Sequence, residues 1–287
     1  MILPPVPTPF DAAGRPDWGA LQAILDRLAP EVDGVLVFGS NGEAPLLAPE
    51  ERRAGLARLR VPGFFLAGVG DESLPQARGH LEAARDAGAD AALAFPPRFF
   101  SGLLDEAAYL AYYRGLAEGG LAVWLYHVPQ LTKVPLPLSV VERLAALPGV
   151  EGIKDSSGEV GRFAYYDARR LGLRVYSGSA VVFLPALLHG AEGGVLAVAN
   201  LVPRLARGIL EAFRQGRLDE ARRLQNRLDP LARLLGRGGP VLLKQAMRHL
   251  GLPAGRPRPP YPEESPLWGA FRPVLEGLAE EGFAVGG

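Results

Sequence analysis

The stretch that decides the fold is AVWLYHVPQLTKVPLPLSVVERLAALPGVEGIK, residues 122–154. It opens with an apolar run that ends on Tyr126, continues through a helical pattern at 138–146, and ends with a second short run at 150–154. Runs that are apolar with little alternation are typical of parallel strands buried on both faces. Parallel neighbours need a crossover connection, which is usually a helix. The stretch therefore predicts one strand–helix–strand unit of an α/β protein.

The same alternation extends over most of the 287 residues. The predicted strands are 2–6, 34–38, 64–67, 91–95, 122–126, 150–154, 174–176 and 194–198, the first of them crowded with prolines. The predicted helices are 18–28, 49–59, 74–87, 105–117, 138–146, 160–170, 181–189 and 202–214. Eight such units in one chain of this length favour a (β/α)8 TIM barrel over an open doubly wound sheet.

After residue 215 the pattern becomes helical only. The predicted helices there are 218–235, 240–250 and 267–281, with a glycine-rich break at 236–239. We therefore expect a barrel over residues 1–215 and a C-terminal helical extension over residues 216–287, not a second independent domain.

The composition excludes several classes of function. Lys+Arg and Asp+Glu are equal at 31 each, so no net charge attracts the chain to nucleic acid or to an anionic membrane. The chain has no cysteine, which excludes disulfides, thiolate metal sites and a cysteine nucleophile. Its four histidines show no metal-ligand spacing, and no apolar run approaches the ~18 residues of a membrane span. With no signal-peptide pattern at the start, we expect a soluble cytoplasmic protein without a metal, nucleic-acid or membrane partner.

Lys154 is the outstanding candidate for chemistry. Barrel enzymes build their active sites at the C-terminal ends of the strands, and Lys154 closes one of them. Burial favours the neutral amine, which is the nucleophile that forms an imine with a carbonyl. The alternative is a structural lysine that extends to solvent or pairs with the adjacent Asp155.

Two further features follow neighbouring strands. Tyr126 closes the strand before that of Lys154, and its phenol could relay a proton, although it could equally be a core tyrosine with its hydroxyl at the rim. The loop GSNG (39–42) precedes a helix and offers backbone N–H groups with hydroxyl and amide side chains, which suit a carboxylate. A plain tight turn is the alternative there. His127 is the histidine that falls near this proposed site.

Five motifs, taken in order, carry a family resemblance. They are VPTPF (6–10), GSNGE (39–43), YHVP (126–129), GIKDSSG (152–158) and SGSA (177–180). On these motifs the chain resembles the N-acetylneuraminate lyase / dihydrodipicolinate synthase family of class I aldolases, nearly from end to end. The resemblance implies no cofactor and a homotetramer built from dimers, with a small-molecule 2-oxo acid as substrate.

The resemblance also implies residue roles. Lys154 matches the imine-forming lysine, Tyr126 the proton-relaying tyrosine, and Ser40 and Asn41 the pair that holds the substrate carboxylate, with Ser40 assisting the tyrosine. Gly178 matches a backbone position near the substrate. The expected catalytic residues are Lys154, Tyr126 and Ser40, and the expected substrate-binding residues are Ser40, Asn41, Gly178, His127 and Ser156.

Two departures from the synthase pattern narrow the function. Leu131 stands where synthases carry an arginine for the semialdehyde carboxylate, and Phe100 where they carry a tyrosine that reaches across the dimer. The motifs look closer to the 4-hydroxy-2-oxoglutarate aldolase / 2-keto-3-deoxygluconate aldolase branch. We therefore expect reversible Schiff-base cleavage of a 4-hydroxy-2-oxo acid to pyruvate and an aldehyde.

Three alternatives remain beside this expectation. One is a dihydrodipicolinate synthase that condenses pyruvate with aspartate semialdehyde, and another is a sugar-acid dehydratase that uses the same lysine. The third is a barrel that binds a small carboxylate without turnover, against which the joint presence of lysine, tyrosine and anion loop argues.

Overall fold

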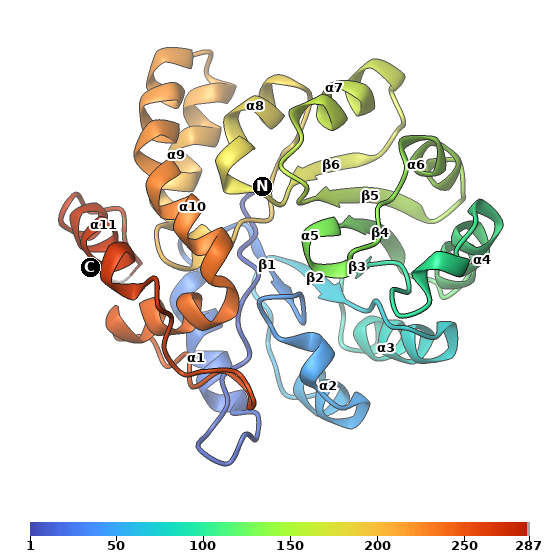
Figure 1. Cartoon of the computed structure of the whole chain (residues 1–287), viewed down its shortest axis with the longest axis horizontal. Helices are drawn as coiled ribbons and strands as arrows, with labels where there is room; N and C mark the ends of the chain where they lie inside the picture. Colours follow the sequence, from blue (N-terminus) through green and yellow to red (C-terminus); the bar gives the residue numbers. More distant parts are fainter. Residues whose placement is uncertain (286–287) are drawn as a thin grey trace.

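The computed structural model describes residues 1–285 and confirms the barrel. Seven parallel strands pair in the order of the sequence, and helices surround them (Figure 1). The strands are β1 (Gly34–Val37), β2 (Phe64–Gly68), β3 (Ala91–Ala94), β4 (Ala122–His127), β5 (Val150–Asp155), β6 (Arg174–Ser177) and β7 (Gly193–Gly194). Because the strands are parallel, their C-terminal ends lie on one face of the molecule. These ends carry the polar side chains that the sequence singled out.

The N-terminal segment closes the barrel without forming the predicted first strand. Ile2 bridges to Gly194 of β7 and Pro5 bridges to Leu36 of β1, and both bridges are isolated. The prediction of a regular strand at 2–6 was wrong because prolines lack the backbone N–H that a ladder needs. The predicted strand at 194–198 was too long, since η4 (Ala197–Asn200) begins within it.

The outer helices lie close to their predicted positions. They are α1 (Trp18–Leu28), α2 (Pro49–Leu56), α3 (Leu74–Asp86), α4 (Glu106–Ala117), α6 (Leu138–Ala145), α7 (Val160–Arg169), α8 (Phe183–Leu188) and α9 (Pro203–Arg214). The helix predicted at 181–189 starts instead as η3 (Ala180–Val182), and α2 ends earlier than predicted. Sequence reasoning did not predict η1 (Ala44–Leu46), η2 (Ser101–Leu103) or α5 (Pro129–Thr132), which are single turns in the loops of the barrel mouth.

The C-terminal helices are α10 (Leu218–His249) and α11 (Trp268–Glu280). Helix α10 packs against α9 and α11 and spans both helices predicted there, with a bend at Gly239, where φ is 56° and ψ is −150°. That positive φ suits glycine, and Pro240 follows it at the start of the second half. The bend carries the second half of α10 toward the barrel mouth.

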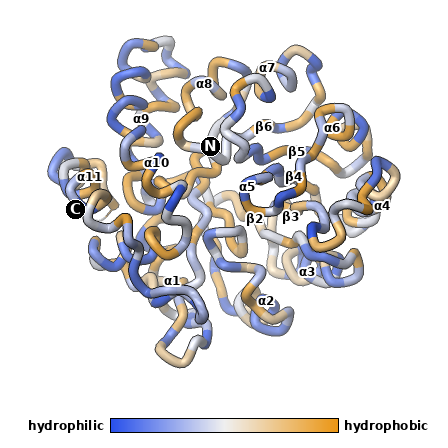
Figure 2. The backbone as a smooth tube through the Cα atoms, viewed as in Figure 1, coloured by the Kyte–Doolittle hydropathy of each residue, from blue (hydrophilic) through white to orange (hydrophobic). Residues whose placement is uncertain are grey.

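The core has two layers, which follow from the alternation of side chains along each strand. Trp124 and Tyr126 of β4 point into the barrel, where they join Leu36, Leu66 and Tyr176. Leu125 points outward, into the larger layer between the strands and the helices. Figure 2 shows the same division, with apolar segments gathered on the strands and on the inner sides of the helices.

Candidate active site

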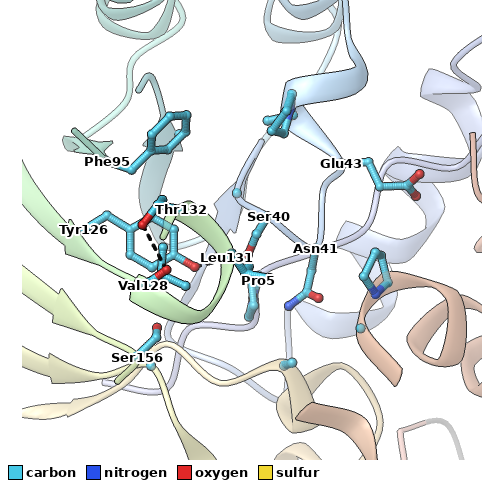
Figure 3. A pocket seen from close by; sticks show the side chains of 18 of the residues that line it. Pro5, Ser40, Asn41, Glu43, Phe95, Tyr126, Val128, Leu131, Thr132 and Ser156 are labelled. Atoms are coloured by element: carbon cyan, nitrogen blue, oxygen red, sulfur yellow. Dashed lines mark hydrogen bonds between the residues drawn. The ribbon is translucent and has the colours of Figure 1, made fainter. Parts of the chain in front are cut away.

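A cavity of about 550 Å³ opens at the C-terminal ends of the strands. Its floor holds the strand-end residues that the sequence singled out, and Figure 3 shows several of them around the space. The second half of α10 contributes Gly239, Pro240 and Val241 to the wall. The predicted residues that line the cavity are Ser40, Asn41, Tyr126, Lys154, Ser156 and Gly178.

Lys154 lies at the end of β5 with only 2% of its surface exposed. It is the register partner of Tyr126 on β4, and its Nζ lies 4.3 Å from the centroid of the Tyr126 ring. Asp155 is paired with Arg162 instead (Nε–Oδ2 2.8 Å), so the salt-bridge alternative for Lys154 does not hold. Within residues 1–285 no carboxylate is paired with the Lys154 amine, which leaves that amine directed at the cavity.

Tyr126 and Ser40 form a hydrogen bond across the barrel mouth. The Tyr126 hydroxyl lies 3.1 Å from Ser40 Oγ, and the Tyr126 ring packs in the inner core. The buried ring agrees with the interpretation of Tyr126 as a core residue. Its hydroxyl in the cavity agrees with the interpretation of Tyr126 as a proton relay. Because each hydroxyl can donate and accept, the pair can pass a proton.

A hydrogen bond and a close backbone approach fix the loop that contains Ser40 and Asn41. Thr8 Oγ1 donates to the carbonyl of Gly42 over 2.7 Å. A Cβ at Gly42 would lie 3.1 Å from the Cα of Phe38, so the close approach of these backbones favours glycine. Such fixation keeps the loop in the geometry that a carboxylate would meet.

The far end of this loop is tied to the C-terminal helices by a buried ion pair. Lys244 of α10 is fully buried, pairs with Glu43, and donates from Nζ to the carbonyl of Arg256 over 2.8 Å. Glu43 Oε2 also accepts from the backbone N–H of Arg258 (2.9 Å). Burial lowers the pKa of Lys244 to about 8. The sequence analysis did not predict this contact, although a glutamate ends the GSNGE motif.

Ser156 and Gly178 flank the lysine. The Ser156 Oγ is buried and has no hydrogen-bond partner among residues 1–285. A Cβ on Gly178 would lie 1.9 Å from that oxygen and 3.0 Å from Lys154 Cε, so any larger residue there would displace the Ser156 hydroxyl. An unpaired buried hydroxyl beside the lysine is what a bound polar ligand would satisfy.

His127 does not reach the cavity. It follows Tyr126 on β4, so its side chain points to the outer face of the strand, where Nδ1 accepts from the backbone N–H of Leu136 (3.2 Å). Burial lowers the pKa of His127 from 6.5 to about 4, because the charged ring would lose its hydration. The substrate contact expected for His127 therefore finds no support in its position.

The same outer face carries a polar network that the sequence did not predict. Asp155 accepts from Arg162 Nε (2.8 Å) and from the hydroxyl of Tyr166 (2.7 Å), both on α7. Its other oxygen accepts from the backbone N–H and the hydroxyl of Ser157. These contacts anchor the end of β5, and so the backbone of Lys154, to the helix behind it.

Metal-binding clusters and membrane-spanning helices are both absent from residues 1–285. In this part of the chain, no three His, Cys, Asp or Glu side chains are grouped as a metal ion would need. None of its helices is long and apolar enough to cross a membrane.

A barrel with a buried lysine beside a tyrosine–serine pair agrees with the class I aldolase that the sequence predicted, and comparison with known proteins supports it. The family model of the dihydrodipicolinate synthetase family matches residues 1–266. The chain belongs to this family and is a class I aldolase, an enzyme of the lyase class.

Curated relatives and solved structures support this assignment over nearly the whole chain. The 4-hydroxy-tetrahydrodipicolinate synthase of Corynebacterium diphtheriae is 33% identical over 269 residues, which cover 91% of this chain and 88% of the relative. Synthase 1 of Streptomyces coelicolor is 34% identical over 280 residues, or 94% and 89%.

Among solved structures, a Thermus thermophilus protein provisionally described as a dihydrodipicolinate synthase is 58% identical, with a TM-score of 0.96. The match covers 99% of this chain and 100% of that one. The E. coli K12 prophage protein YagE, solved with pyruvate, is 27% identical with a TM-score of 0.88, over 97% and 98% of the two chains.

Proposed function

We propose that this enzyme reversibly cleaves a 4-hydroxy-2-oxo acid into pyruvate and an aldehyde. The observation that carries the proposal is the Lys154 amine, which is buried without an ionic partner among residues 1–285 and lies in one cavity with the hydrogen-bonded Tyr126–Ser40 pair. A desolvated amine beside a proton relay is the arrangement that imine chemistry requires. A family member solved with pyruvate supports pyruvate as the keto acid.

The proposed reaction begins with imine formation. The loop of Ser40 and Asn41 receives the substrate carboxylate, and the Lys154 amine attacks C2 of the keto group. Loss of water from this adduct gives an iminium on Lys154. The positive nitrogen then acts as an electron sink for the bond between C3 and C4.

Carbon–carbon cleavage follows. Tyr126, assisted by Ser40, accepts the proton of the C4 hydroxyl, the C3–C4 bond breaks, and its electron pair moves into the iminium to give an enamine. The aldehyde leaves. A proton returned to C3 regenerates the iminium, and water hydrolyses it to release pyruvate and the free lysine.

The second candidate is a 4-hydroxy-tetrahydrodipicolinate synthase, and the names of the curated relatives favour it. Both reactions would use Lys154, Tyr126 and pyruvate, and they differ in the second substrate. Two side chains favour the lyase. Leu131 lines the cavity where the synthase pattern has an arginine, and Phe100 has no hydroxyl to relay a proton. Leu131 cannot form the bidentate, charge-assisted contact with the semialdehyde carboxylate that an arginine at this position provides in the synthase pattern.

Parallel assays decide between the two candidates. Pyruvate release from 4-hydroxy-2-oxoglutarate and from 2-keto-3-deoxygluconate is followed with a coupled dehydrogenase, and condensation of pyruvate with aspartate semialdehyde is measured on the same enzyme batch. We expect measurable release from 4-hydroxy-2-oxoglutarate or from 2-keto-3-deoxygluconate and negligible condensation, with Lys154→Ala as the blank for all three reactions. Faster condensation than cleavage would overturn the lyase proposal in favour of the synthase.

A further inference from the structure

Only two cationic side chains line the active-site cavity within the described residues, Lys154 and Arg98. In the proposed reaction Lys154 forms a covalent bond with the keto carbon. The acidic lining residue, Glu43, is already neutralised by Lys244. Any second anionic group on a substrate in this cavity therefore has Arg98 as its available cation.

The fold places Arg98 and Leu131 in the segments that follow two neighbouring strands. Arg98 lies in the loop after β3 and Leu131 in the segment after β4, and these two strands are hydrogen-bonded neighbours. Both residues line the same cavity. The Arg98 cation can therefore bind an anionic group of a ligand that also contacts Leu131 on the neighbouring loop.

Arg98 is held so that part of its guanidinium stays available. Glu72 accepts from Arg98 Nε (2.8 Å), and its other oxygen accepts from the backbone N–H groups of Arg98 and Phe99, both at 2.9 Å. The guanidinium carbon lies 5.5 Å from the centroid of the Phe95 ring. Within residues 1–285 these contacts use Nε and leave the Nη1 and Nη2 amino groups without a protein hydrogen bond. Those groups form the edge with which arginine binds a carboxylate bidentately.

One part of the cavity wall suits a polyhydroxylated ligand poorly, because it is formed by the apolar side chains Phe95, Val128 and Leu131. The nearby Thr132 hydroxyl is already engaged with the carbonyls of Val128 and Val134. A chain of free hydroxyls would thus lose hydration with few partners in return.

We propose that Arg98 binds a carboxylate at the far end of the substrate, so that the substrate class is a 4-hydroxy-2-oxo dicarboxylate and not a polyhydroxy monocarboxylate. This inference rests on the proposed function and deepens it. With C1 on the loop of Ser40 and Asn41 and C2 on Lys154, the remaining carbons extend toward the mouth, where Arg98 lies. Arg98 is then a specificity-determining residue.

Imine trapping tests the inference without requiring turnover. The probes are 2-oxoglutarate and 2-oxopentanoate, which have the same number of carbons and differ in a carboxylate or a methyl at the far end. Cyanoborohydride reduces the iminium on Lys154, and intact-protein mass spectrometry gives the half-saturating concentration of each probe. The variants are Arg98→Leu, Arg98→Lys and, as a matched loss of charge on the exposed face of α4, Arg114→Leu.

For the wild type we expect half-saturation by 2-oxoglutarate at a concentration about tenfold or more below that of 2-oxopentanoate, from the charge-assisted contact. Arg98→Leu should remove this preference by weakening 2-oxoglutarate alone, Arg98→Lys should restore part of it, and Arg114→Leu should leave it intact. Equal changes for both probes, or none, in Arg98→Leu would overturn the inference.

The failure of the proposed function has different signatures. A wild type that traps no 2-oxo acid on Lys154 overturns the imine chemistry and the inference with it. A wild type that traps both probes but releases no pyruvate from 4-hydroxy-2-oxoglutarate overturns the proposed cleavage, while the comparison of the two probes still decides the role of Arg98.

Discussion

At the scale of the residue, Lys154 owes its chemical character to the side chains that surround it. Its own neighbour in sequence, Asp155, is turned to the opposite face of β5 and taken up by Arg162 and Tyr166. The amine is left to face the Tyr126 ring at 4.3 Å. Alternation along one strand thus separates the nucleophile from the carboxylate that would otherwise neutralise it.

We predict that Lys154→Ala abolishes imine formation and turnover and leaves the fold intact. The side chain ends in an open cavity and not in a packed core, so its removal creates no new enclosed void. Borohydride reduction with pyruvate, followed by peptide mapping, checks the assignment, and the exposed Lys133→Ala is the control. Labelling of Lys133 or Lys244 instead would show that the nucleophile is misassigned.

For Tyr126→Phe we predict retained imine formation and a loss of cleavage by about 10²–10⁴-fold, the usual worth of a positioned proton-transfer group. The ring stays in the inner core and only the hydroxyl that bonds Ser40 is lost. Single-turnover trapping and steady-state pyruvate release separate the two steps. Turnover close to that of the wild type would mean that another group, or water, moves the proton.

His127 predicts a pH dependence of stability. Its pKa is about 4 in the folded chain and 6.5 in the unfolded chain, so between these values the unfolded state binds the extra proton. The free energy of unfolding should therefore fall as the pH drops from 6.5 to 4, by up to about 3 kcal/mol from this group.

The variant His127→Asn, whose amide oxygen can accept from Leu136 N–H in place of Nδ1, isolates the His127 contribution. Urea unfolding of both proteins at several pH values measures it. The expected result is a steeper fall for the wild type over this range, and parallel curves would contradict the assignment.

At the scale of the element, the Glu43–Lys244 pair connects the loop of Ser40 and Asn41 to the second half of α10. Both side chains are buried, so each depends on the other for its charge to be tolerated. The C-terminal helices thereby help to fix the loop that is proposed to bind the substrate carboxylate.

We predict that Lys244→Met destabilises the protein by about 3–5 kcal/mol, because it removes the ion-pair partner of the buried Glu43 carboxylate. The double variant Glu43→Gln with Lys244→Met removes both charges and should recover part of the loss. Denaturant unfolding of the wild type, both single variants and the double variant measures the coupling. If the loss in the free energy of unfolding of the double variant equals the sum of the losses in the two single variants, Glu43 and Lys244 are not energetically coupled.

At the scale of the whole molecule, three large apolar side chains stand out on the loop that follows β3. Phe99 is 79% exposed, Phe100 71% and Leu103 80%. Clustered apolar exposure of this kind marks interaction surfaces. Together with the family resemblance, it supports our proposal that the enzyme is a homotetramer built from dimers.

We therefore predict a solution mass of four times the 30.6 kDa of one chain. The paired substitutions Phe100→Ser and Leu103→Ser should shift the distribution toward smaller species by removing apolar area from the proposed contact. Sedimentation velocity over a range of concentrations measures both. A wild type that sediments as a monomer would exclude the tetramer, and an unshifted variant would place the interface elsewhere.

The order of the strands and helices and the residues at the strand ends could be predicted from the amino-acid sequence alone. Lys154, Tyr126 and Ser40 could be placed together in advance because the ends of consecutive parallel strands meet on one face. Hydrophobic periodicity is a local property, and so the element types followed from it, with boundaries shifted by a few residues.

The contacts between segments far apart in the chain became known from the folded molecule. Ile2 and Pro5 close the barrel by isolated bridges, Lys244 pairs with Glu43, and Arg98 lines the same cavity as Leu131. The outward position of His127 also emerged only once the faces of β4 were known. The physical reason is that burial and the pairing of charges depend on which surfaces folding brings together, and one segment's own sequence does not contain its partner.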